Sequence, residues 1–494
     1  MPALAGLWGP DAADALHRDH RVPARRALDA LRAERSALPA VAVLADLFVL
    51  GRAVTIAELG VAFPALGIQG AVDLGFVSIV GEKASAALDL RPYSFEDTAG
   101  AGSLWIASDL GELATGGALP EDHVLGVGGA SLTLSGLMFQ APVESVLDLG
   151  TGCGIQALHA ARHSRRVVAT DISRRALEIA AMNAALNGVE NIEFRLGSLF
   201  EPVAGERFDR IVSNPPFVIT PRVDGVPSYE YRDGGMVGDA LVEAVLTGVA
   251  DHLAPGGTAQ LLGNWEYHDG DDGLPRVRAW LDSVHLDYWI VEREVLSAPL
   301  YAETWIRDGG TTPSTPDFDR LYAAWLDDFA DRGVSGVGFG YVVLRKPQSS
   351  VTLRRTEQQH GPLGDTEPRG VGAHLEEGIA ASDWLAGTDD AALSAARLSV
   401  AGDITEERHY WPGDENPTAM LVRQGGGFGR TVSLDTALAA LIGACDGELS
   451  VGAICAALAQ LLEVDEAALT ADLLPAVREL VLDGILSPSS SNRD

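Results

Sequence analysis

The sequence has 494 residues, and at roughly 150 residues per domain this length predicts about three structural units. Its formal net charge of -33 disfavours non-specific binding to a phosphate backbone, although a local basic patch would still permit a nucleic-acid substrate. The three cysteines are too few and too scattered for a disulfide framework or a metal knuckle, so no metal site is predicted. The N-terminus lacks a secretory signal pattern, and the apolar runs are too short to cross a bilayer. We therefore expect a cytoplasmic protein without a membrane partner; the sequence predicts no oligomeric state.

The order of the predicted elements divides the chain into four segments. Residues 1–100 are predicted to form a helical, winged-helix-like module, because short helices follow one another and lead into a strand. Residues 101–347 hold a regular alternation of strands and helices. Residues 348–433 are predicted to be a polar linker, Gln348–Gly372, followed by a mixed segment. Residues 434–494 are predicted to form a second winged-helix-like module, with three amphipathic helices and a short strand.

Strands and helices alternate between about residues 145 and 344, which predicts an α/β fold with a mainly parallel sheet between two layers of helices. Two of the helices are predicted at Arg174–Leu186 and Asp239–Leu253, each closed by a turn that contains glycine. The number of strands predicts a seven-stranded Rossmann-like core. The strands are predicted at Ser145–Leu149, Val167–Asp171, Ile192–Leu196, Arg210–Ser213, Thr258–Gly263, Leu286–Glu292 and Phe339–Leu344.

The first predicted strand runs directly into a glycine-rich turn, Asp148–Gly154. Glycines allow the backbone to turn tightly and to approach a ligand, but many nucleotide sites share such a turn. The second predicted strand ends in Asp171. A carboxylate at that place can accept hydrogen bonds from both hydroxyls of an adenosine ribose. The alternative for Asp171 is to cap the helix that follows it.

The fourth predicted strand ends in Asn214-Pro215-Pro216-Phe217, and this motif indicates a reaction. The lone pair of a planar amide or amino nitrogen is delocalised, so a site that methylates such a nitrogen needs acceptors for its N–H groups. The Asn214 side chain and the Pro215 carbonyl are such acceptors. The prolines stiffen the turn, and Phe217 can stack on a planar group. The alternative is a rigid turn without a chemical role.

Together, the segments DLGTGCG, TDIS and SNPPF resemble the motifs of class I S-adenosylmethionine-dependent methyltransferases of the small-domain group. This group includes the HemK/PrmC-type release-factor glutamine methyltransferases and the ribosomal-RNA guanine amino-methyltransferases. The resemblance covers roughly residues 124–344 and implies S-adenosyl-L-methionine as cofactor, with Asn214 to Phe217 at the acceptor nitrogen and Asp171 at the cofactor ribose. It implies cofactor contacts from Asp148, Gly150, Thr151, Gly152, Gly154, Asp171, Ile172 and Asn214.

The sequence departs from the family after the third predicted strand, where an Asp often meets the adenine amino group. Here Ser198 and Leu199 stand in its place, so we expect a weaker hydrogen bond from Ser198 and packing of Leu199 on the ring. The segment after the acceptor motif, Val218–Gly238, is long, polar and aromatic. It is predicted to help form the acceptor pocket, with the candidates Tyr229, Tyr231 and Arg232.

Three functions stay open from the sequence. The first is N-methylation of a glutamine side chain in a protein, favoured by the length of Val218–Gly238 and by the acidic charge. The second is methylation of an exocyclic amino group of an RNA or DNA base that an end module presents. The third is a non-catalytic binding protein on the same fold, against which the intact acceptor motif argues. An NAD(P)-dependent oxidoreductase is not expected, because the first loop lacks the G-x-G-x-x-G pattern.

Overall fold

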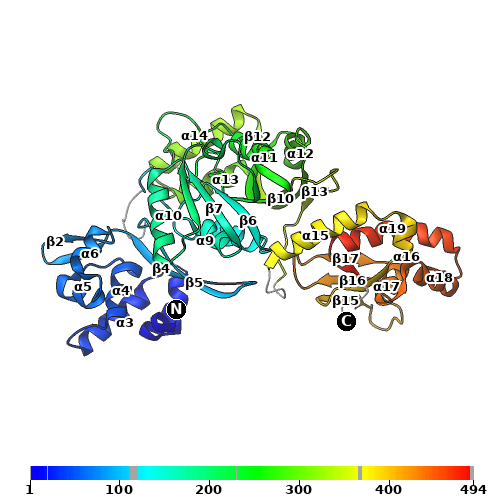
Figure 1. Cartoon of the computed structure of the whole chain (residues 1–494), viewed down its shortest axis with the longest axis horizontal. Helices are drawn as coiled ribbons and strands as arrows, with labels where there is room; N and C mark the ends of the chain where they lie inside the picture. Colours follow the sequence, from blue (N-terminus) through cyan, green and yellow to red (C-terminus); the bar gives the residue numbers. More distant parts are fainter. Residues whose placement is uncertain (1, 19, 112–118, 230, 365–369, 490–494) are drawn as a thin grey trace.

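The computed structural model describes residues 2–18, 20–111, 119–229, 231–364 and 370–489. Figure 1 shows three lobes: an N-terminal helical lobe in blue, a central lobe in cyan and green, and a C-terminal lobe in yellow to red. Within these ranges no single helix is both long and apolar enough to cross a membrane. Two short helices, α5 (Ile56–Ala62) and α6 (Gly67–Asp73), meet that test only when taken together, across a bend of 91°.

The central lobe is built on one eight-stranded sheet. Its strands are β6 (Val143–Leu149), β7 (Ser164–Asp171), β8 (Ile192–Leu196), β9 (Phe208–Ser213), β10 (Leu253–His268), β11 (Asp287–Ser297), β12 (Val334–Arg345) and β13 (Arg354–Gln358). Their order is β13-β11-β12-β10-β9-β6-β7-β8. The pairs among β6 to β10 are parallel, whereas β12 runs antiparallel to both β10 and β11. The α/β prediction and all seven predicted strands are confirmed, and β13 is an additional strand.

Helices cover both faces of this sheet because side chains alternate between the faces along each strand. Val146 of β6 packs in a cluster with Ala157 and Ala160, whereas its neighbour Leu147 belongs to the cluster on the other face. The predicted helix at Arg174–Leu186 is present with those bounds. The helices of this lobe are α8 (Gly129–Leu137), α9 (Ile155–Ala161), α10 (Arg174–Leu186), η2 (Glu201–Val203), α11 (Ala240–His252), α12 (Gly273–Asp282), α13 (Ala298–Asp308) and α14 (Pro316–Asp331).

The N-terminal lobe combines short helices with a three-stranded sheet of order β1-β3-β2. A hairpin of β4 (Asp89–Asp97) and β5 (Gly100–Ser108) follows it and packs on α10, where the Asn183 side chain bonds the Ala107 backbone in both directions. The expected domain limit at residue 100 therefore falls inside a hairpin. The remaining elements are α1 (Pro2–Trp8), α2 (Pro10–His17), α3 (Val22–Glu34), α4 (Ala40–Leu44), η1 (Ala45–Val49), β1 (Val54–Thr55), β2 (Val77–Val80) and β3 (Lys83–Ala86).

The C-terminal lobe contains two small antiparallel sheets, β18-β14-β19 and β15-β16-β17, packed with helices. The three helices and the final strand expected after residue 434 are present. Whether the two end modules are winged-helix-like stays a prediction. The elements are α15 (Gly370–Ala386), α16 (Asp390–Ala395), β14 (Arg397–Val400), β15 (Ile404–His409), β16 (Ala419–Gln424), β17 (Thr431–Leu434), α17 (Thr436–Gly443), β18 (Asp446–Ser450), α18 (Val451–Leu462), α19 (Glu466–Leu482) and β19 (Leu486–Pro488).

The expectation of a linker over Gln348–Gly372 is wrong for the part of this segment that belongs to the main sheet. Strand β13 lies within it and pairs in parallel with β11, and α15 begins at its end. The sequence of β13, RRTEQ, has no alternation of apolar and polar residues. Its side chains form ion pairs rather than an apolar face, which removes the pattern by which a strand is usually recognised.

Candidate functional site

The predicted site residues follow three strands whose ends lie side by side. Leu149 of β6 is paired with Thr170 of β7 and with Ser213 of β9. Because these parallel strands end at the same edge, the segments that begin at Gly150, Asp171 and Asn214 meet at the carboxyl edge of the sheet. A cavity of about 670 Å³ opens there.

The glycine turn after β6 adopts a conformation that side chains rarely allow. Gly150, Gly152 and Gly154 have φ values of 75°, 54° and 85°. A Cβ added at Gly154 would lie 3.0 Å from the Cβ of Ala180 on α10. The turn is held against the next strand, because the amides of Gly150 and Thr151 both donate to the Thr170 carbonyl over 2.9 Å. Its shape is therefore built into the sheet edge.

Asp171 does not itself cap α10, and its carboxylate holds the backbone of two loops at the edge of the sheet. One carboxylate oxygen accepts from the Gly152 amide over 2.9 Å, which ties β7 to the glycine turn. The other accepts from the Ser173 amide over 2.8 Å, just before α10, where Ser173 is the N-cap. The carboxylate also lines the cavity. Asp171 thus orders both loops around the place where a ribose is expected.

Asp148 lies behind the glycine turn and does not line the cavity. Its position therefore does not support the predicted direct contact with a cofactor. It is fully buried, and its Oδ2 accepts from the Thr151 hydroxyl over 2.6 Å. Burial raises the pKa of Asp148 to about 7, against the hydrogen bond from Thr151, which lowers it. The Asp148 side chain therefore stabilises the glycine turn through its hydrogen bond with Thr151.

The raised pKa of Asp148 predicts a pH-dependent stability difference between the protein and its Asp148→Asn variant. The fold favours the neutral carboxyl, so the stability that Asp148 contributes is present below a pH near 4 and is lost as the pH rises through about 7. Between pH 5 and pH 8, the variant should gain roughly 2 to 3 kcal/mol relative to wild type, at 1.36 kcal/mol per pKa unit. Denaturant unfolding of the cofactor-free protein at both pH values measures this. The same substitution at the exposed Asp251 is the control, and an equal difference at pH 5 and pH 8 would contradict the assignment.

Ser198 and Leu199 lie after β8 and both line the cavity. Leu199 has a φ of 46°, which is uncommon for a branched side chain and costs about 1 to 3 kcal/mol. Such strain persists only where the surrounding structure imposes it. Its occurrence beside the cavity agrees with a role for Leu199 in packing on a ligand.

The acceptor motif forms the part of the cavity wall that follows β9, and all four of its residues line the cavity. The Asn214 Oδ1 atom is buried and has no hydrogen-bond partner among the residues that the structure describes. A buried amide oxygen without a partner costs free energy, so such an atom needs an explanation. The Phe217 ring packs against Phe339 and Trp305, with centroid distances of 5.2 and 6.3 Å.

The three candidates of the following segment differ in position. Tyr231 lines the cavity and is only half-buried, and burial raises its pKa to about 12. Arg232 also lines it, but its guanidinium donates to the Trp305 carbonyl over 2.9 Å and to Asp308 over 3.1 Å. Tyr229 is buried beneath that guanidinium, 4.6 Å from the ring centroid, and does not line the cavity. The predicted pocket position of Tyr229 is therefore not found, because its ring is buried and covered by the Arg232 guanidinium.

Other lining residues were missed from the sequence. The glycine-rich stretch before α8 forms one wall, and Gln156 is fixed there by a 2.8 Å bond to the Ser131 carbonyl. Its glycine content was a usable signal. Trp305 and Asp308 come from α13, far along the chain, and nothing in their local sequence pointed to a site. The lining outside the prediction includes His123, Leu125, Gly126, Gly128, Ser131, Gln156, Met236, Trp305 and Asp308.

Of the predicted cofactor residues, Gly154 also stays outside the cavity, since it faces α10. The predicted residues that line it are Gly150, Thr151, Gly152, Asp171, Ile172, Ser198, Leu199, Asn214, Pro215, Pro216, Phe217, Tyr231 and Arg232. Among the described residues, no group of three or more His, Cys, Asp or Glu side chains is arranged to hold a metal ion.

A sheet with the order β8-β7-β6-β9-β10-β12-β11, an antiparallel β12 and a glycine turn after β6 defines the class I methyltransferase fold. Residues 128–268, which form part of the central lobe, match the methyltransferase small domain family. Residues 1–87 and 376–488 match two domains of unknown function, DUF7059 and DUF7782.

Two curated relatives each match about a quarter of this chain. A release factor glutamine methyltransferase of Xylella fastidiosa is 42% identical over 135 residues, which cover 26% of this chain and 49% of the relative. A ribosomal protein uL3 glutamine methyltransferase of Bradyrhizobium diazoefficiens is 39% identical over 125 residues, covering 23% and 39%. Among solved structures, a ribosomal protein L11 methylase of Lactobacillus delbrueckii is 26% identical, covering 32% of this chain and 67% of that one, with a TM-score of 0.23. The chain thus spans half or less of the length of the first two relatives.

Proposed function

We propose that this protein is an S-adenosylmethionine-dependent N-methyltransferase whose acceptor is a planar nitrogen, namely the side-chain amide of a glutamine in a protein. The observation that carries the proposal is the buried, unpartnered Oδ1 of Asn214, in the same cavity as the glycine turn and Asp171. An acceptor held there without a protein donor suits a substrate N–H group.

The cofactor half of the cavity fits a nucleoside with a polar tail. Gly150 and Gly152 bring bare backbone to its wall, Asp171 supplies a carboxylate, and Leu199 supplies an apolar surface. An ionised carboxylate has about four acceptor sites, so bonds to the turn and to ribose hydroxyls are compatible. The volume lies within the range of cofactor sites, about 300 to 1,000 Å³. When bound, S-adenosylmethionine supplies a methyl group activated by a sulfonium.

In the acceptor half, the residues of the chain orient a nitrogen that is a poor nucleophile. The Asn214 side-chain oxygen and the Pro215 carbonyl would accept the two N–H groups of an amide, and the Phe217 ring would lie against its plane. The two prolines limit the freedom of these acceptors. The chemistry then depends on alignment, and no strong base is required of the site.

Three features support a protein glutamine over a nucleic-acid base. The two curated relatives cited above are named for glutamine methylation. The net charge of -33 opposes a phosphate backbone. Helix α6, which would be the recognition helix of a winged-helix-like N-terminal module, contains no Lys or Arg. We propose the end modules as partner-facing, winged-helix-like units in a cytoplasmic enzyme, with a catalytic domain that begins near residue 101 and extends past residue 347 to include β13.

The proposal is tested by transfer of a labelled methyl group from S-adenosylmethionine to cell lysate that has been treated with protease or with nuclease. We expect the labelled material to be destroyed by protease and to yield methylated glutamine on enzymatic digestion. Label that survives protease treatment and is lost on nuclease treatment would show that the acceptor is RNA or DNA. Absence of transfer to any fraction would overturn the activity.

Replacing Asp171 with alanine should weaken the binding of S-adenosylmethionine by about 1 to 3 kcal/mol, or roughly fivefold to 150-fold, because hydrogen bonds to a charged group are lost. Calorimetry on the full chain measures this. Ser173→Ala is the matched control, since it removes the N-cap of α10 and leaves the carboxylate in place. Wild-type affinity in the Asp171→Ala variant would limit Asp171 to a structural role.

A further inference from the structure

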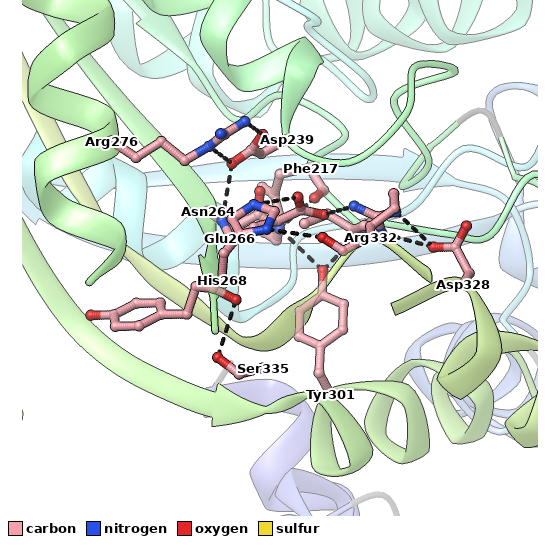
Figure 2. Close-up of polar contacts among 12 residues, drawn as sticks. Phe217, Asp239, Asn264, Glu266, His268, Arg276, Tyr301, Asp328, Arg332 and Ser335 are labelled. Carbon is pink, nitrogen blue, oxygen red and sulfur yellow. Dashed lines mark hydrogen bonds and ion pairs between the residues drawn. The ribbon is translucent and has the colours of Figure 1, made fainter. Parts of the chain in front are cut away.

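Two buried polar side chains lie directly behind the acceptor motif and outside the cavity. Asn264 belongs to β10 and is 1% exposed, and Tyr301 belongs to α13 and is 4% exposed. Figure 2 shows the Tyr301 hydroxyl directed at Asn264, with Phe217 on the other side of the amide. Neither residue lines the cavity, so neither touches a ligand there.

The pair holds the backbone on both sides of Val218. The Asn264 side-chain amide donates to the Phe217 carbonyl over 2.5 Å and to the Tyr301 hydroxyl over 3.1 Å. The same hydroxyl accepts from the Ile219 amide over 3.1 Å. Burial raises the pKa of Tyr301, so this hydroxyl stays neutral. One hydroxyl and one amide thus fix a peptide carbonyl and a peptide N–H two residues apart.

The opposite side of this short segment is fixed as well. The Val218 amide donates to the Arg232 carbonyl over 2.8 Å, and the Thr220 hydroxyl bonds Asp233 over 2.5 Å. The Tyr301 ring is itself held by aromatic neighbours, with centroid distances of 6.0 to 6.1 Å to Trp305, Trp325 and Phe329. A rigid base therefore supports the backbone that leaves the acceptor motif.

We propose that Asn264 and Tyr301 are positioning residues for methyl transfer: they fix the backbone of Phe217 to Ile219 and, through it, the ring of Phe217 and the acceptors of Asn214 and Pro215. The inference rests on the proposed function. A reacting geometry must be held within about half an ångström, and a misplacement of about 1 Å can cost a hundredfold in rate. The glycine turn and Asp171 lie on other loops, so cofactor affinity does not depend on this pair.

The first test compares Tyr301→Phe with Tyr322→Phe in the full chain. Tyr322 lies on α14 in the same aromatic cluster, so its variant removes a neighbouring hydroxyl without touching the acceptor motif. Hydrogen exchange is followed with S-adenosylmethionine bound, in peptides that cover residues 214–221 and in peptides from α9 and β10. We expect Tyr301→Phe to speed exchange only in residues 214–221. Unchanged exchange there would overturn the inference, whatever the acceptor is.

The second test uses the protein acceptor isolated from lysate. Tyr301→Phe should lower kcat about tenfold to a hundredfold, while the Kd of S-adenosylmethionine stays within about twofold. Asn264→Ala should likewise lower kcat without changing the Kd of S-adenosylmethionine. This variant replaces Tyr301→Phe in the test if the latter does not fold. In an Asn214→Ala background the Tyr301 substitution should have almost no further effect, because both act on one element. Full additivity would show a general structural defect and overturn the positioning role.

The two tests separate this inference from the proposed function. Faster exchange in residues 214–221 without methyl transfer by the wild-type protein would support the positioning of the motif and overturn the activity. Methyl transfer that Tyr301→Phe and Asn264→Ala leave unchanged would support the activity and overturn the positioning role.

Discussion

The Asn214→Ala variant is expected to lose about a hundredfold in methyl transfer, on the order of 3 kcal/mol, while it binds S-adenosylmethionine nearly as well as wild type. Loss of one preorganised hydrogen-bonding group at a reacting centre has this size. The deficit should fall on kcat/KM for the acceptor, because the side chain is proposed to act on the acceptor nitrogen. Kinetics with the labelled protein acceptor and calorimetry with the cofactor measure the two quantities.

A second signature separates this role from that of a turn residue. In the cofactor-free protein the Asn214 Oδ1 is buried without a partner among the described residues, which costs about 1 to 3 kcal/mol. The alanine variant should therefore unfold at the same temperature as wild type or higher, although its methyl transfer is strongly reduced. Asn214→Asp keeps an oxygen in place and should retain more activity than alanine. Near-normal transfer by the alanine variant would reduce the motif to a rigid turn.

The parts of the site that the sequence predicts well are those fixed by local backbone geometry. Gly150 and Gly152 have positive φ, Asp171 ends one buried strand and Asn214 follows another, so their types and spacing carry the information. Parallel pairing then brings these strand ends to one edge. The Leu199 prediction also rests on position after a strand, and Leu199 lines the cavity with a positive φ.

Residues whose roles depend on long-range packing were predicted less well. Tyr229 and Arg232 occur in one polar, aromatic segment, and only the fold shows that Arg232 is held by α13 and that Tyr229 lies beneath it. The Tyr301 hydroxyl bonds the amide of Ile219, just after the acceptor motif, from 82 positions away. The strand β13 is short and charged, so its pairing with β11 leaves no periodic pattern in the sequence.

The charge of β13 reflects a buried ion-pair network that joins the main sheet to the C-terminal lobe. Glu357 accepts two hydrogen bonds of 2.7 Å from Arg430 and one of 2.5 Å from the Trp289 ring on β11. Arg355 bonds Asp483, after α19, over 2.5 Å. Burial alone would raise the pKa of Glu357, but Arg430 and Arg355 outweigh it and hold that pKa below its usual range.

The Glu357→Gln variant should therefore lower the free energy of unfolding by about 3 to 5 kcal/mol, because two buried guanidinium groups would then share Asp483 as their one directly bonded carboxylate. Glu357 and Arg430 are 12% and 6% exposed, so water screens little of this loss. We expect a lower first transition in scanning calorimetry and faster proteolysis between the central and C-terminal lobes. Cofactor affinity should not change, since β11 and β13 lie at the far end of the sheet from β7 and β8.

The same strand supplies the matched control. Arg354 pairs with Asp282 over 3.0 Å, and both side chains are about half exposed. Because water screens an exposed pair, Asp282→Asn should change stability by less than about 1 kcal/mol and leave the lobes joined. An equal effect of the two substitutions would mean that the C-terminal lobe is held by its apolar contacts alone. A large effect of Glu357→Gln alone would show that the buried charges of β13 hold the C-terminal lobe on the main sheet. Strand β13 would then be both a part of the central lobe and the place where the C-terminal lobe is attached.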